Sequence, residues 1–118
     1  MILVDTSVWV DHLRRSNAKL AGLLEHGQVA CHPFVIGELV LGNLSPRSEV
    51  PNLLAELPLV DLVEHDEVMV FVAAHALAGS GIGWVDAHLL CSAALSGAKI
   101  WTGDRQLHAA AEKCGLHA

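Results

Sequence analysis

The sequence predicts a single α/β domain built of three α/β/α layers, with a small, mostly parallel central sheet of four to five strands. Short apolar segments at residues 2–4, 28–31 and 99–102 alternate with longer helical patterns. The length of 118 residues is enough for one hydrophobic core but too short for two. No repeat, low-complexity tract or linker divides the chain, so we expect residues 1–118 to form one domain.

Composition narrows the class of protein. Hydrophobic residues make up 53% of the chain, yet no apolar run is long enough to span a membrane, which predicts a soluble globular protein. Asp5 and Asp11 interrupt the amino terminus before a signal peptide can form, so we expect a cytoplasmic protein. Its Cys31, Cys91 and Cys114 lie far apart in apolar surroundings, which predicts reduced thiols. The net charge of −6 predicts weak general affinity for nucleic acid.

The first strand carries the residue around which the site is predicted. Residues 2–4 read as a short buried strand, and Asp5 stands at its end. In an open parallel sheet, ligands bind beyond the carboxyl ends of the strands, so Asp5 is delivered to that edge. Thr6 and Ser7 supply hydroxyls beside it and a cap for a helix over residues 8–15, in which Asp11 and Arg15 form a surface pair.

The next segments predict two helices and a strand. Residues 19–26 form a helix that Gly27 ends, and residues 28–31 form a strand. Pro33 then starts a helix whose residues 34–42 are apolar almost all the way round, which predicts a buried helix. Glu38 is its only charge, and a buried glutamate is costly unless it is paired or ligates an ion.

The middle of the chain predicts a helical hairpin. Ser45 and Pro46 resemble a cap and a first helical residue, opening a helix to about Leu57 with a leucine-rich face that is either core or a partner groove. Residues 58–63 form a connection that includes a short strand in one interpretation. Asp66 and Glu67 are first-turn acids of a helix to about residue 78, and residues 79–83 form a glycine-rich loop that matches no nucleotide-binding motif.

The last third places two more acids. In the helix predicted over residues 85–96, His88, Ser92 and Ser96 form one polar stripe that we expect to be solvated. Asp86 shares its face with leucines and therefore points inward. Residues 99–102 form a strand, and Asp104 follows it at the start of a final helix that ends near residues 113–115. Residues 116–118 add a small edge strand in the same prediction.

Four carboxylates converge in this arrangement. Asp5 and Asp104 follow strands at the carboxyl edge, and Glu38 and Asp86 lie in early turns of helices that begin there. Such a cluster is tolerable at neutral pH chiefly with a bound cation, and oxygen-only ligands select Mg²⁺ or Mn²⁺. Each acid also has a structural explanation: the aspartates suit helix amino ends, and Glu38 can pair with an arginine.

The ordered motifs resemble those of PIN-domain ribonucleases. They are Asp5-Thr6-Ser7 after the first strand, Glu38 in an apolar helix, Gly83-Trp84-Val85-Asp86 entering a helix, and Thr102-Gly103-Asp104 after a late strand. Their order and spacing, and the length of the chain, resemble in particular the toxin subunit of VapBC-type toxin–antitoxin pairs. The resemblance covers essentially the whole chain, and no acidic position is missing.

This resemblance implies a metal-dependent endoribonuclease in which the four acids hold Mg²⁺ or Mn²⁺, as one ion or two. The metal would activate a water for in-line attack on a phosphodiester. The resemblance assigns supporting roles to Ser7 and Thr102, which are alternatively a cap and a strand-end residue. Arg105 is a candidate phosphate contact, as are Arg14, Arg15 and Lys19, with a solvated charge as the alternative for each.

The resemblance also implies two protein partners. A cognate VapB-like antitoxin would lay its carboxyl-terminal segment along helices near the site. A groove formed by Leu41, Leu44, Leu53 and Leu54 would accommodate an amphipathic segment. The second implied partner is another copy of the chain, in a homodimer.

Three other interpretations fit parts of the sequence. Aspartyl-phosphate chemistry at Asp5 would need a second acid two residues later, where the chain has Ser7. A protein of the same fold that binds metal or antitoxin without cutting RNA is the non-enzymatic rival. Zinc is a weaker alternative, because the 8 histidines and the cysteines lack paired ligand spacing, and we expect most histidines at the surface.

Overall fold

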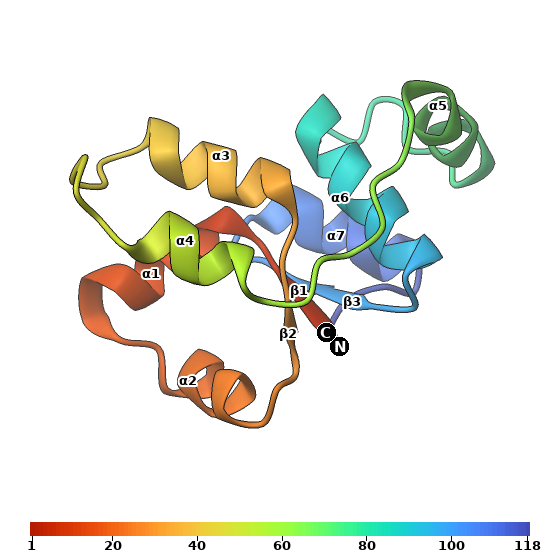
Figure 1. The fold of residues 1–118 in the computed structure, drawn as a ribbon. Helices are drawn as coiled ribbons and strands as arrows, with labels where there is room; N and C mark the ends of the chain where they lie inside the picture. Colours follow the sequence, from red (N-terminus) through yellow and green to blue (C-terminus); the bar gives the residue numbers. More distant parts are fainter.

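The computed structural model describes residues 1–118 and contains short strands alternating with helices (Figure 1). The elements in chain order are β1 (Ile2–Val4), α1 (Thr6–Arg15), α2 (Ala18–Glu25), β2 (Val29–Ala30), α3 (Pro33–Leu41), α4 (Val50–Ala55), α5 (His65–Ala74), α6 (Trp84–Leu95), β3 (Lys99–Trp101) and α7 (Arg105–Lys113). The predicted α/β class is therefore confirmed.

The central sheet is smaller than predicted. It has three parallel strands in the order β2-β1-β3, with Leu3 opposite Ala30 on one side and opposite Ile100 on the other. The prediction of four to five strands was too high, because the segments at Leu59 and His117 each make only a single parallel bridge, to Cys31 and Ile100 respectively. These bridges continue the sheet at both edges without forming full strands.

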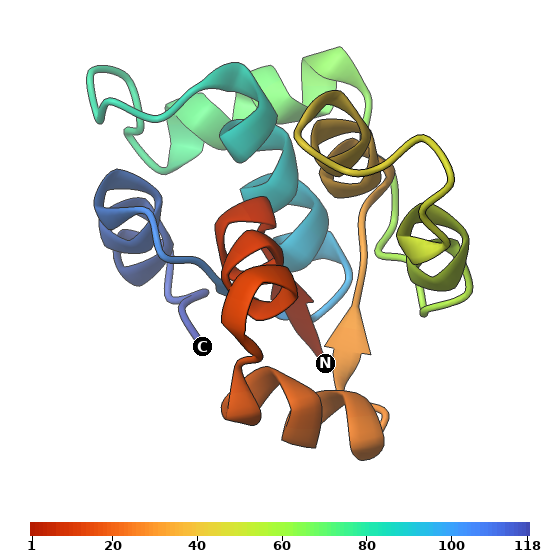
Figure 2. The same ribbon diagram turned by 90° about the vertical axis from the view of Figure 1, so that its left-hand side faces the viewer.

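Helices cover both faces of this sheet. Leu3 and Val4 are neighbours in β1, so their side chains point to opposite faces, yet both are 0% exposed. A strand that is buried on both faces is typical of a three-layer α/β domain. In Figures 1 and 2, α3, α5 and the first turns of α6 lie at one end of the sheet, and α2 lies at the other.

Helix α3 is half exposed, and the prediction of a buried helix was wrong. Val35 and Leu39 are buried, whereas Val40 and Leu41 are 55% and 89% exposed. Glu38 is exposed as well, so its charge is solvated and no burial cost needs to be offset. The outer face of α3 is apolar although no other element of this chain covers it. Composition alone therefore cannot distinguish such a helix from a buried one.

Helix α4 begins later than predicted. The hydroxyl of Ser48 accepts a hydrogen bond from the Val50 amide at 3.2 Å, just where the helix starts. Pro51 lies in the first turn of the observed helix, where its missing N–H costs nothing. A helix starting at Pro46 would place Pro51 in its interior and lose a hydrogen bond. Helix α5 likewise ends early, before Ala76, whose φ is +51°.

The polar stripe of α6 is buried, not solvated as predicted. His88 and Ser92 are 8% and 0% exposed, and the half-buried Ser96 hydroxyl accepts a hydrogen bond from the Asp61 amide at 2.8 Å. Phe34 of α3 and Trp84 of α6 pack on His88 and account for part of this burial. The cysteines are free thiols, as expected. None of the helices has the length and apolar character needed to cross a membrane.

Candidate active site

Asp5 is fixed at the end of β1 by both its backbone and its carboxylate. Its amide donates to the Trp101 carbonyl at 2.9 Å, which continues the pairing of β1 with β3. Although Asp5 occupies the N-cap position of α1, its side chain makes no capping hydrogen bond. Asp5 is only 7% exposed. Its carboxylate instead accepts hydrogen bonds from the hydroxyls of Thr102 (2.7 Å) and Ser7 (2.9 Å). Both donors reach Oδ2, so Oδ1 is left for another ligand.

Ser7 and Thr102 join the ends of β1 and β3. Their hydroxyl oxygens are 3.4 Å apart, and each also accepts a backbone amide: Gly103 donates to Ser7 at 2.9 Å and Asp104 donates to Thr102 at 3.0 Å. Ser7 lies in the first turn of α1 rather than capping it. The two hydroxyls therefore hold the Asp5 carboxylate against the turn that carries Asp104.

Asp104 caps α7 and still presents a free oxygen. Its Oδ1 accepts from the Leu107 amide at 2.9 Å, so the capping role that we considered for this residue is present. Capping uses a single carboxylate oxygen. Oδ2 has no hydrogen-bond donor in the structure, and the side chain is exposed. A structural role and a ligand role are therefore compatible at this residue.

Glu38 is brought toward Asp5 by the contact between α3 and α1. These helices pack together, and the Thr6 hydroxyl donates to Glu38 Oε1 at 2.8 Å. The arginine partner considered for Glu38 does not occur. The role of Thr6 was not predicted, because nothing in the local sequence shows which residue 32 positions away its hydroxyl meets.

Asp86 lies in the first turn of α6 and is half-buried, in agreement with its predicted inward orientation. Its Oδ2 accepts a long hydrogen bond from the Gly83 amide at 3.4 Å. Burial raises the pKa of Asp86 above its ordinary value, and the charges of Asp5, Asp104 and Glu38 raise it further. All three other acids act on Asp86, so the four carboxylates share one electrostatic environment.

No cation of the protein balances this cluster. The ion pairs in the structure are Arg15–Asp11 and His108–Glu112, and neither includes the four acids. As the side chains stand, no three acidic, histidine or cysteine residues are grouped closely enough to hold a metal ion. The oxygen-only donor set nevertheless fits a hard divalent cation, and binding requires the carboxylates to close on it.

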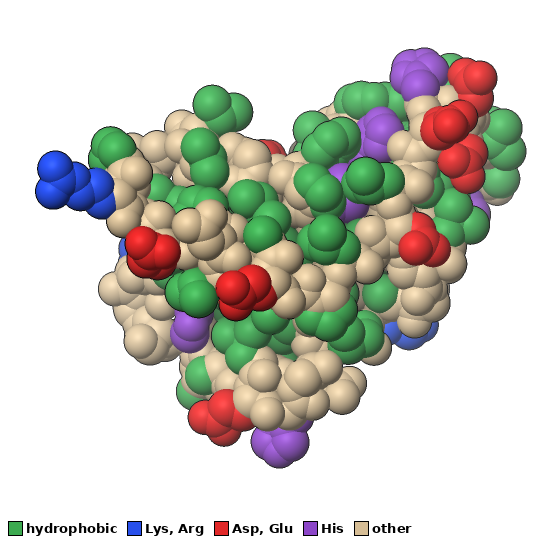
Figure 3. Space-filling view, in the orientation of Figure 1, with side chains coloured by type: hydrophobic (Ala, Val, Ile, Leu, Met, Phe, Trp, Pro, Cys, Tyr) green, Lys and Arg blue, Asp and Glu red, His purple; other side chains and the backbone are tan.

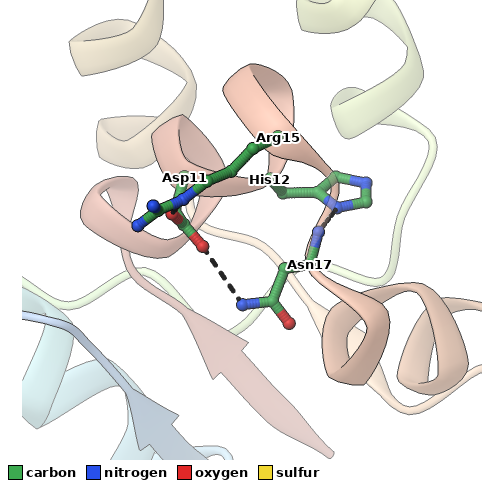
Figure 4. A network of polar contacts seen from close by, with 4 residues as sticks. All are labelled: Asp11, His12, Arg15 and Asn17. Atoms are coloured by element: carbon green, nitrogen blue, oxygen red, sulfur yellow. Dashed lines mark hydrogen bonds and ion pairs between the residues drawn. The ribbon is translucent and has the colours of Figure 1, made fainter.

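Among the basic residues near the site, Arg15 is already paired with an acid of the protein. Arg15 pairs with Asp11 at 2.6 Å, and Asn17 and His12 complete a network that joins α1 to α2 (Figure 4). The Arg15 hydrogen bond, followed by that from Asn17, lowers the pKa of Asp11.

Of the three remaining candidate phosphate contacts, one is engaged and two are unpaired. Lys19 lies over the Trp101 ring, 4.6 Å from its centroid, and is therefore engaged in a cation–π contact. Arg14 and Arg105 make no ion pair and no hydrogen bond to another side chain, so their guanidinium groups are available to a phosphate.

A row of packed rings, which was not predicted from the sequence, joins the start of α3 to α6 and to the start of α5. His32, Phe34, His88, Trp84 and His65 follow one another at centroid distances of 4.8, 5.2, 5.2 and 4.9 Å. His32 is fully buried and caps α3 by accepting the Phe34 amide at 2.9 Å. Burial, with a smaller effect from His88, lowers the pKa of His32 to about 4. Most histidines are at least partly exposed, as expected, but His32 and His88 are buried.

The fold and the arrangement of the four acids can be compared with those of known protein families. A family model described as the PIN domain matches residues 2–113. The chain therefore belongs to the PIN-domain family.

Within that family the chain is similar to Ribonuclease VapC32 of Mycobacterium tuberculosis. The proteins of strains CDC 1551 / Oshkosh and ATCC 25618 / H37Rv are each 50% identical to it over 117 residues, which is 98% of this chain and 94% of the relative. This relationship confirms the VapC-type toxin predicted from the four acidic motifs.

Proposed function

We propose that this protein is a metal-dependent endoribonuclease toxin of a type II toxin–antitoxin pair, with Asp5, Glu38, Asp86 and Asp104 as its catalytic and metal-binding residues. The observation that carries the proposal is that hydrogen bonds hold Asp5, Glu38 and Asp104 around the ends of β1 and β3 with no lysine or arginine paired to them. The 50% identity to a protein named as a ribonuclease supports RNA hydrolysis as the reaction.

The proposed cofactor is Mg²⁺ or Mn²⁺, held by the four carboxylates. A bound ion of this kind supplies charge stabilisation on the phosphate oxygens and lowers the pKa of water for attack on phosphorus. The protein contributes preorganisation: the Ser7 and Thr102 hydroxyls orient the Asp5 carboxylate, and the Leu107 amide orients that of Asp104. Thr6 does the same for Glu38. Each of these acids retains an oxygen for the ion.

The test is cleavage of a structured RNA pool by the purified, antitoxin-free protein in Mg²⁺, in Mn²⁺ and in EDTA. Asp5→Asn and Asp86→Asn should abolish cleavage because each removes a carboxylate ligand while keeping the side-chain volume. Asp61→Asn is the matched control, since Asp61 is exposed and lies outside the four acids. Activity that survives EDTA, or that is unchanged in both site variants, would contradict the proposal.

Calorimetry with Mn²⁺ separates the enzyme from the non-enzymatic rival. A protein that binds Mn²⁺ through the four acids but cuts no RNA in any metal would be a binding module of the same fold. A protein that neither binds Mn²⁺ nor cuts RNA would have no metal site at these residues. The proposed enzyme should bind Mn²⁺ and lose that binding in Asp5→Asn.

The proposed antitoxin site is a groove of about 420 Å³ beside Glu38. Its walls come from α1 and from the end of α3, and include Leu13, Arg14, Glu38, Leu39 and Leu44. The predicted leucine groove was only partly right: Leu44 lines this groove, but Leu54 is buried, and Leu41 and Leu53 are exposed outside it. Apolar walls with Glu38 at their edge suit an amphipathic VapB-like segment that carries a basic residue.

Leucine variants test this groove. Leu13→Asp should weaken antitoxin binding, because it places a charge in the apolar wall, whereas Leu62→Asp should not. Both side chains are exposed, at 43% and 64%, so neither change should unfold the protein. Equal binding of the antitoxin by wild type and Leu13→Asp would exclude the groove.

We also propose a homodimer formed by the apolar surface of α3, α5 and α6. Phe34 and Trp84 both pack on His88 and remain 40% and 42% exposed, and Val40 and Val70 are 55% and 70% exposed. Figure 3 shows hydrophobic side chains spread over the face that carries α3 and α4. Exposed apolar surface of this kind commonly marks an interface. Light scattering should give a dimer for wild type and a monomer for Val40→Asp.

A further inference from the structure

A polar groove adjoins Asp104 on the side of the glycine-rich loop. It measures about 790 Å³ and is lined by Ser80, Gly103, Asp104, Arg105, Gln106 and Ala109. Pockets of several hundred Å³ accommodate small organic ligands. In Figure 2 the loop before α6 lies above α7. The residues that line the groove come from this loop, from the turn after β3 and from α7.

Gly81 allows Gln106 to approach the loop. A Cβ atom at Gly81 would lie 2.5 Å from the Gln106 amide nitrogen, and the glycine has a φ of +86° that other residues rarely adopt. Gln106 therefore packs directly on the loop backbone at a position that requires glycine. This contact explains the glycine at position 81, for which the sequence suggested no function.

Two side chains in the groove are available to a ligand, and a third polar group is buried at its wall. The Arg105 guanidinium makes no ion pair, and the Gln106 side chain makes no hydrogen bond within the protein. The Ser80 hydroxyl is buried and has no hydrogen-bond partner. A cation beside an amide matches the phosphate and the base edge of a nucleotide, since single-stranded RNA is read through hydrogen bonds to exposed base edges.

We propose that this groove binds the nucleotide next to the scissile bond, with Arg105 contacting its phosphate and Gln106 reading its base. The inference rests on the proposed ribonuclease function, because the groove shares Asp104 with the acidic site. The ligand is a single-stranded segment of RNA.

A second groove next to the first could hold the rest of an RNA strand. The Gly103 amide, at the wall of this groove, donates to Ser7, which lines a second groove with Arg14 and Arg15. Arg14 is unpaired there. A strand that crosses the Ser7–Gly103 contact meets an unpaired arginine in each groove, which compensates locally for the negative net charge.

The experiment is cleavage of a randomised single-stranded RNA library, with the base frequency measured at every position around the cut. Gln106→Ala should reduce the base preference about 10-fold at one position next to the cut and leave the other positions unchanged. Gln106→Glu, which keeps the shape but replaces the amide donor, should change the preferred base. Gln28→Ala is the matched control, because Gln28 lies outside the groove.

Two further variants test the packing and the phosphate contact. Gly81→Ala should displace the amide and reproduce the Gln106→Ala profile. Arg105→Ala should lower kcat/KM for all sequences about 10-fold and reduce the salt dependence by roughly one phosphate contact. Arg47→Ala, the control for loss of a surface charge, should change neither quantity. An unchanged base profile in both Gln106 variants would overturn the proposal while leaving the ribonuclease intact.

Binding separates failure of the subsite from failure of the enzyme. If wild type cuts no RNA, fluorescence anisotropy with a short single-stranded RNA in EDTA supplies the readout. Binding that Arg105→Ala weakens about 10-fold and Arg47→Ala does not would support the groove as a nucleotide site without the proposed reaction. Equal binding by wild type and Arg105→Ala would overturn the subsite as well.

Discussion

Replacing Thr102 by valine removes one hydroxyl and almost nothing else. Thr102 is 7% exposed, and valine has nearly the same shape, so the packing around β3 should persist. The lost hydroxyl donates to the Asp5 carboxylate at 2.7 Å and accepts the Asp104 amide at 3.0 Å. The change therefore removes a support from two of the proposed metal ligands at once.

The expected cost follows from these two hydrogen bonds. A hydrogen bond to a charged group contributes roughly 1.5–3 kcal/mol, and a neutral one about 1 kcal/mol. Ser7 still donates to Asp5, which limits the loss. We expect the free energy of unfolding to fall by about 2–3 kcal/mol, which a domain of ordinary stability survives. Because outer groups orient metal ligands, we also expect Mn²⁺ affinity to fall about 10- to 100-fold.

The assay combines urea unfolding in EDTA with Mn²⁺ calorimetry and RNA cleavage. Thr102→Ser is the control, since it retains the hydroxyl and loses only a methyl group. It should keep the metal affinity of wild type. Wild-type Mn²⁺ affinity in folded Thr102→Val would refute the positioning role, even if the variant were less stable. Unchanged stability would refute the hydrogen-bond argument itself.

Other predictions concern pH and metal. Because the pKa of Asp86 is raised in the folded protein, the fold is more stable with this carboxyl protonated than with it ionised. This stabilisation is fully present below the unfolded pKa of 3.8 and is lost as the pH rises through the folded value. Asp86→Asn should therefore raise the melting temperature in EDTA at about pH 7 but not at about pH 3. The lowered pKa of His32 has the opposite sign, so stability should fall as the pH drops from 6.5 toward about 4. His32→Asn, which keeps a cap acceptor, should flatten that part of the urea-unfolding profile. Mg²⁺ at a hundred times its Kd should stabilise wild type by about 2.7 kcal/mol. Asp5→Asn should show no such gain in a thermal scan.

The positions of Asp5, Asp86 and Asp104 could be predicted because local rules determine them. Asp5 follows a strand so apolar that it must be buried, and the parallel sheet then puts it at the carboxyl edge with Asp104. The helical period gave the inward orientation of Asp86. None of these inferences depends on which element covers another element.

The wrong predictions concern the burial of helix faces, which depends on other segments of the chain that pack against them. Glu38 was chosen because its helix appeared buried, yet the structure shows it exposed and bound to Thr6. The spacing of His88 and Ser92 correctly placed them on one face, but their polarity suggested solvent, whereas His88 is covered by Phe34 and Trp84 and both residues are buried. Periodicity identifies residues that share a face, and only tertiary packing decides what that face meets.

The same packing explains how four repelling carboxylates share one edge of the sheet. Neutral donors satisfy one oxygen of each acid: hydroxyls at Asp5 and Glu38, and backbone amides at Asp86 and Asp104. A neutral donor orients a carboxylate without cancelling its charge, whereas a lysine or arginine would do both. The unbalanced charge explains why burial and repulsion together raise the pKa of Asp86. The fold therefore fixes the direction of the acids and leaves their charge without a partner in the chain, as the proposed metal site requires.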